Sequence, residues 1–118
     1  MKKLVIIEDD SDAREMAVFT FENSGYEVIQ SAKEIPVEEI IGIKPHLVVI
    51  GYTVNGSPGN DICAKLKADP LTSHIPVILY SANQDIDKIS VKSCADGIIA
   101  KPYELDDFVY LVHRIALS

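Results

Sequence analysis

The sequence has no tryptophan, only two cysteines and no long apolar run. Cys63 and Cys94 have neither the number that a disulfide scaffold requires nor the spacing of a metal-binding knuckle, so we expect buried, reduced thiols. Every apolar run is far shorter than the roughly 18 residues of a membrane span, and acids interrupt the first run too early for a signal peptide. We therefore expect a cytoplasmic protein that does not contact a membrane.

Positive charge is also scarce. The chain has 11 lysines and arginines against 18 aspartates and glutamates, which gives a net charge of −7. A surface of this sign repels nucleic-acid phosphates and anionic lipids, so we expect no direct contact with nucleic acid. With 47% hydrophobic and 25% charged residues, the composition is that of an ordinary folded protein. The length of 118 residues predicts a single domain over residues 1–118.

Five short apolar runs, rich in valine and isoleucine, divide the chain at residues 4–7, 26–29, 47–50, 75–79 and 98–99. Such runs are typical of strands that are covered on both faces. Helical spacing appears between them, at about residues 11–24, 37–43, 60–68 and 85–93, and again in an amphipathic segment over residues 105–116. Strands that alternate with helices predict one doubly wound α/β sheet with parallel strands.

In a sheet of this kind, chemistry takes place beyond the carboxyl ends of the strands. The motifs at those ends resemble the receiver domain of bacterial two-component response regulators. Five segments carry the likeness in order over residues 2–117, namely LVIIEDD at 4–10, GYEV at 25–28, PHLVVI at 45–50, HIPVILYSA at 74–82 and ADGIIAKPY at 95–103. The resemblance implies a flavodoxin-like fold with strand order 2-1-3-4-5, and a role in phosphorelay signal transduction rather than an enzymatic activity.

The resemblance also assigns the residues of a phosphorylation site. Glu8 and Asp9 match the acidic pair that holds Mg²⁺, Ser81 matches the hydroxyl after the fourth strand, and Lys101 matches the lysine after the fifth. The position of the acceptor aspartate falls on Gly51, which has no side chain to phosphorylate. We therefore expect no catalytic residue, relics of a phosphate site at Ser81 and Lys101, and a weak or vestigial Mg²⁺ site that the domain does not require.

Two further departures concern the switching surface. In the family an aromatic residue stands three positions before the lysine, where this chain has Ile98, and the loop after the acceptor carries a proline where this chain has Asn55. The resemblance implies that partners bind the face formed by the fourth helix, the fifth strand and the fifth helix, which includes Ile98 and Tyr103. We expect signalling proteins, or a second copy of the chain, to dock there.

Two functional hypotheses follow. The first is a pseudo-receiver that works without phosphorylation, through protein contacts. The second is a true phosphoryl-accepting receiver with a non-standard acceptor, for which Thr53 offers a hydroxyl but no adjacent general base. Glu8 and Asp9 are equally compatible with plain loop acids, and Asp10 is expected to cap the following helix. The sequence leaves open whether the 118 residues are a stand-alone regulator or part of a longer protein.

Overall fold

The structure is a computed structural model that describes residues 2–51, 53–54, 57–82 and 95–101. Its centre is a sheet of five parallel strands in the order β2-β1-β3-β6-β7, which confirms the predicted fold class and strand order. The strands are β1 (Lys3–Ile7), β2 (Glu27–Ser31), β3 (Leu47–Gly51), β6 (Val77–Ala82) and β7 (Gly97–Lys101). The helices predicted at 85–93 and 105–116 lie outside the described residues.

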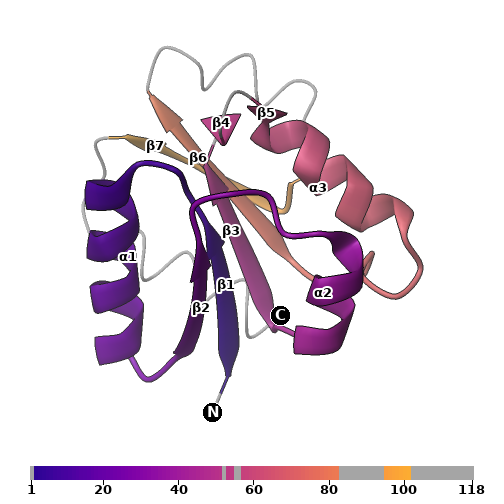
Figure 1. Cartoon of the computed structure of the whole chain (residues 1–118), viewed down its shortest axis with the longest axis horizontal. Coiled ribbons are helices and arrows are strands. Elements are labelled where there is room, and N and C mark those ends of the chain that lie inside the picture. Colours follow the sequence, from indigo (N-terminus) through magenta and orange to yellow (C-terminus); the bar gives the residue numbers. More distant parts are fainter. Residues whose placement is uncertain (1, 52, 55–56, 83–94, 102–118) are drawn as a thin grey trace.

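Three helices cover the sheet, namely α1 (Ser11–Asn23), α2 (Val37–Ile43) and α3 (Gly59–Ala68). Figure 1 shows α1 on one face of the sheet and α2 and α3 on the other. Alternate residues of a strand point to opposite faces. Val5 and Ile7 accordingly join the core cluster that contains residues of α2 and α3, whereas Leu4 and Ile6 join the cluster that contains residues of α1.

Each strand differs from its predicted apolar run at one end or both, and the fourth strand and β2 show why. The fourth strand of the sheet begins at Val77 rather than at residue 75, because Pro76 has no N–H to donate and ends the preceding loop. Ile75 is nevertheless buried in the core beneath α2 and α3. β2 runs to Ser31, two residues beyond its apolar stretch, because its backbone continues to pair with β1 as far as Ile7.

The turn region after β3 contains a small element that the sequence did not predict. β4 (Thr53–Val54) and β5 (Ser57–Pro58) form a two-stranded antiparallel pair just before α3. Val54 is buried against the α2 and α3 side of the core.

The start of α1 follows the predicted capping chemistry. The Asp10 carboxylate accepts hydrogen bonds from the backbone N–H groups of Asp12, at 3.0 Å, and Ala13, at 3.3 Å, which confirms Asp10 as the N-cap. Beyond the last turn, Gly25 adopts a positive φ of 94° that a glycine reaches without steric cost.

Two other expectations concern the thiols and membrane contact. Cys63 is a buried, reduced cysteine, as predicted, and Cys94 lies outside the described residues. Within the described ranges, no helix is both long and apolar enough to cross a bilayer.

Candidate functional site

The candidate site lies at the carboxyl ends of β1 and β3, at the upper edge of the sheet in Figure 1. Ile7 of β1 pairs with Ile50 of β3, so the next residue on each strand, Glu8 and Gly51, reaches the same level. The backbone N–H of Glu8 donates a 2.9 Å hydrogen bond to the carbonyl oxygen of Ser31 at the end of β2. Three strand ends therefore converge on Glu8 and Gly51.

The side chain of Glu8 turns into the protein. The residue is only 1% exposed, although an ionisable side chain is rarely buried to this extent. A β-carbon built on Gly51 would lie 3.2 Å from Cδ of Glu8, 3.7 Å from its Oε1 and closer still to its Oε2. The carboxylate of Glu8 thus fills the volume that the side chain of any other residue at position 51 would need.

A second glycine packs against the other side of the same backbone. Gly59 begins α3, and a β-carbon on it would overlap the carbonyl oxygen of Gly51 and lie 3.1 Å from its carbonyl carbon. The start of α3 therefore rests directly on the backbone at the end of β3. Its N-cap, Pro58, makes no side-chain hydrogen bond. Neither Gly51 nor Gly59 has room for a side chain in this arrangement.

Arg14 holds the loop that carries the acids, and the sequence analysis did not single it out. Its Nη1 donates a 2.8 Å hydrogen bond to the backbone oxygen of Glu8, and its Nε donates one of 3.2 Å to Oε1 of Gln30 in β2. The sequence signal that could have identified Arg14 is its place: a cationic residue in the first turn of a helix that follows an acidic loop. Arg14 connects the loop, α1 and the edge strand.

The two predicted Mg²⁺ ligands have different surroundings in this structure. Mg²⁺ prefers an octahedron of oxygens, keeps several water molecules and is bound through one or two carboxylates. Glu8 is buried with its carboxylate beside Gly51, while Asp9 is exposed and Asp10 caps α1. In the part of the chain that the structure describes, no three acidic, histidine or cysteine side chains gather as metal ligands would.

The other predicted site residues lie on the neighbouring strands. The backbone of Ser81 in β6 pairs with Ala100 of β7, and Ala82 pairs with Lys101, so Ser81 and Lys101 reach the same edge of the sheet as Gly51. Ile98 pairs with Leu79 in the interior of β7. The structure describes these residues by their backbone and not by their side chains, and Tyr103 lies outside the described residues.

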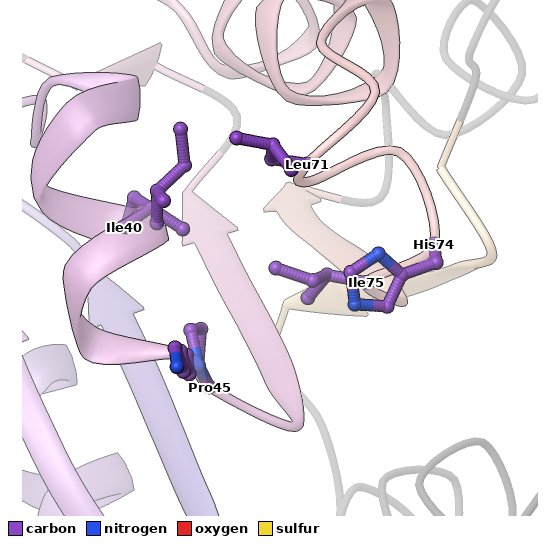
Figure 2. A pocket seen from close by; sticks show the side chains of 7 residues that line it. Ile40, Pro45, Leu71, His74 and Ile75 are labelled. Carbon is purple, nitrogen blue, oxygen red and sulfur yellow. The ribbon is translucent and has the colours of Figure 1, made fainter.

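A pocket opens at the opposite edge of the sheet, near the amino ends of β3 and β6. Figure 2 shows Ile40, Pro45, Leu71, His74 and Ile75 around it, and Ile41 and Lys44 complete its lining. Its volume of about 260 Å³ is below the range of typical small-molecule sites. It contains none of the residues that the sequence predicted for the phosphorylation site.

Comparison with known proteins identifies the family to which this fold belongs. The family model of the response regulator receiver domain matches residues 4–113, and the chain therefore belongs to the receiver domain family. Over 111 residues it is 31% identical to the phosphate regulon transcriptional regulatory protein PhoB of Pseudomonas aeruginosa, a match that covers 92% of this chain and 48% of that protein. It is 27% identical over 118 residues to the DNA-binding master transcriptional regulator RpaA of Synechocystis, with coverages of 98% and 49%.

Solved structures show the same architecture. A response regulator from Chloroflexus aurantiacus superposes with a TM-score of 0.91 at 28% identity, covering 99% of this chain and 98% of that one. The receiver domain of a sensor histidine kinase from Pseudomonas aeruginosa, solved with a magnesium ion in its active-site cleft, superposes with a TM-score of 0.89 at 17% identity, with coverages of 99% and 98%. The chain spans about half the length of the curated relatives named above.

Proposed function

We propose that this receiver domain transmits signals without accepting a phosphoryl group, through contacts with other proteins. The observation that carries the proposal is the residue at the carboxyl end of β3. In the position where the family resemblance implies an acceptor aspartate, this chain has Gly51, and the carboxylate of Glu8 fills the space beside it. A phosphoryl acceptor must supply a nucleophilic oxygen from a side chain, which glycine lacks.

The chemistry around Gly51 supports the same proposal. A receiver with its aspartate would combine three carboxylates with one lysine, whereas Glu8, Asp9 and Lys101 supply two carboxylates and one lysine. The loss of one negative charge weakens the attraction of the site for Mg²⁺. In this proposal Mg²⁺ binding is weak or vestigial, and Ser81 and Lys101 are relics of a phosphate site.

The contact surface is the second part of the proposal. The face implied by the family resemblance, around Ile98 and Tyr103, lies for the most part outside the described residues. Within the described part, α1 exposes Met16 to 52% and Phe19 to 71%, and these side chains are one helical turn apart on its surface. Neighbouring exposed apolar side chains support a role in protein contacts, and the net charge of −7 opposes direct binding to nucleic acid.

Intact-mass measurement after incubation with acetyl phosphate and Mg²⁺ tests this function. A receiver domain of established phosphorylation serves as the positive control in the same reaction. We expect the positive control to gain one phosphoryl group and this chain to gain none. A phosphoryl group on any residue of this chain would contradict the proposal, and mapping it would decide whether Thr53 or another side chain is a non-standard acceptor.

A further inference from the structure

The pocket between α2 and the loop that precedes β6 has walls from two separate segments. Ile40 and Pro45 belong to α2 and the residues that follow it, whereas Leu71 and Ile75 belong to the loop. Figure 2 shows these four apolar side chains around one open space. An engineered apolar cavity of about 150 Å³ takes up benzene. The volume of about 260 Å³ here therefore suits a single ring or a branched chain with a small head group.

The polar part of the lining comes from Lys44 on the α2 wall and His74 on the loop wall, and no acidic side chain is among the described residues that line the pocket. Lys44 carries a positive charge, and the ring of His74 offers an N–H donor. Both residues are exposed, so their polar atoms can reach a ligand at the mouth of the pocket. In a chain with a net charge of −7, this lining favours an apolar ligand with a negative head group.

The backbone of Lys44 is an independent sign of function. Among the described residues it is the one non-glycine residue with a positive φ, at 55° with a ψ of 55°, where α2 ends. A β-carbon makes this left-handed conformation costly, and glycine is the usual residue at such a helix end. Strained residues of this kind cluster at functional sites and ligand clamps. A lysine in this position therefore points to a use for its side chain.

Two further lysines prepare the surroundings for a negative group. The Nζ of Lys3 donates a 3.3 Å hydrogen bond to the carbonyl oxygen of Ile43, at the end of α2. The Nζ of Lys67 donates one of 2.8 Å to the carbonyl oxygen of Ile75, in the wall of the pocket. Backbone oxygens that would repel an incoming anion are thus already paired with cations.

The loop wall is held in place by its own hydrogen bonds. The N–H of Leu71 donates to Oδ1 of Asp69 at 2.8 Å, and the N–H of Ile75 donates to the carbonyl oxygen of Thr72 at 3.0 Å. The buried Thr72 hydroxyl donates to the carbonyl oxygen of Leu66 in α3 at 2.6 Å. Because the wall is already ordered, a ligand loses little binding free energy to ordering it.

We propose that this pocket binds a small organic acid, whose single ring or branched chain lies among the apolar side chains and whose carboxylate meets Lys44 and His74. The site is at the amino edge of the sheet, opposite the carboxyl edge that holds Gly51. The inference goes beyond the proposed function and does not depend on it, because a ligand could bind here whether or not the domain accepts a phosphoryl group.

An NMR titration of the native chain with phenylacetate, followed at the backbone amides, tests the proposal. Phenylacetate combines one ring with one carboxylate. We expect saturable shifts at Ile41, Lys44 and Ile75, with a Kd of about 1 mM or tighter. Phenylacetamide has the same shape without the charge and should bind about five-fold more weakly. Acetate has the charge without the ring and should bind at least about ten-fold more weakly.

Variants at Lys44 separate binding from stability. Lys44→Gln should weaken phenylacetate binding about five-fold, whereas Lys33→Gln, which removes the same charge from an exposed residue beyond β2 at the opposite edge, should leave it unchanged. Lys44→Gly should weaken binding as much as Lys44→Gln without lowering Tm, because glycine adopts the left-handed conformation without steric cost. A merely structural role for Lys44 predicts no loss of affinity in the glycine variant.

Several outcomes would overturn the proposal. One is the lack of any saturable shift with millimolar phenylacetate, and another is a set of shifts confined to residues away from the pocket. Equal binding of phenylacetamide would show that the pocket accepts any apolar group, such as a side chain of a partner protein, rather than an acid. Equal affinities of the Lys44→Gln and Lys33→Gln variants would remove Lys44 from the site.

Discussion

The two edges of the sheet are built in different ways. At the amino edge, backbone and side-chain hydrogen bonds fasten the strands: Lys3 N–H donates to Nδ1 of His46 at 3.0 Å, and Asp96 bridges Lys67 and the N–H of Val77 at 2.8 Å each. At the carboxyl edge, the hydrogen bonds of Glu8 with Ser31 and Arg14 are accompanied by a close fit of the buried Glu8 side chain and two glycines. We infer that the amino edge tolerates conservative changes that preserve hydrogen bonding, whereas the carboxyl edge tolerates very few changes of size.

The largest expected effect is at Gly59 on the carboxyl edge. Gly59→Ala places a methyl group on the Gly51 carbonyl, which is backbone and unable to turn aside, so we expect a loss of about 3 kcal/mol of unfolding free energy. Urea denaturation of the native chain and of the Gly59→Ala variant measures this difference in unfolding free energy. A loss of less than about 0.5 kcal/mol would show that the carboxyl edge has room for a side chain at position 59.

The next effect is at Asp96 on the amino edge. Asp96→Ala removes the partner of Lys67 and the acceptor of the Val77 N–H, and we expect a loss of about 1–2 kcal/mol after allowance for the partial exposure of the pair. Asp96→Asn is the control, because its amide oxygen keeps the bond to Val77. If the asparagine variant is as unstable as the alanine variant, ion pairing rather than backbone hydrogen bonding dominates this edge.

A smaller loss is expected at the helix cap of the carboxyl edge. Asp10→Ala leaves the N–H groups of Asp12 and Ala13 without their side-chain acceptor and should cost about 1 kcal/mol. Asp10→Asn retains the acceptor and should recover most of the stability. Equal stabilities of the native chain and the alanine variant in chemical denaturation would count against a role for this cap.

The smallest effect depends on pH. Burial raises the pKa of Tyr26, at the amino edge, above its usual value of 10.0. The unfolded chain then loses this proton first as pH rises, so the stability that Tyr26 contributes is complete below pH 10 and is lost as pH rises toward the higher pKa of the folded state. Tyr26→Phe keeps the edge-on ring contact with Phe21 and removes the titration.

The urea concentration at the midpoint of unfolding is measured for the native chain and for the Tyr26→Phe variant between pH 7 and pH 11. We expect the difference in favour of the phenylalanine variant to grow above pH 10. Parallel curves across that range would show that ionisation of Tyr26 does not destabilise the fold.

Much of the fold could be predicted from the sequence, because buried parallel strands require continuous apolar runs and the helices between them require apolar spacing. The order of the strands came from the family resemblance. Boundaries were less certain: β2 continues to Ser31 through pairing alone, and Lys44 ends α2 in a left-handed conformation with φ of 55°, where glycine is the usual signal.

The site was predictable in part. The family resemblance assigned positions in the site to Glu8 and Gly51, but the contact between them depends on strand register and side-chain direction, which composition does not encode. The structure places the Glu8 carboxylate beside Gly51, and the role of Glu8 as a weak metal ligand stays a prediction. Arg14 was missed because its partners are the backbone of Glu8 and the amide of Gln30 on another strand.

A crystal structure of the native chain soaked in Mg²⁺ tests the central claim most directly. The account predicts that the Glu8 carboxylate stays packed over the Cα of Gly51 and that no ordered Mg²⁺ is bound by Glu8 and Asp9. A Glu8 side chain turned outward, ligating Mg²⁺ together with Asp9 and leaving open space over Gly51, would contradict it.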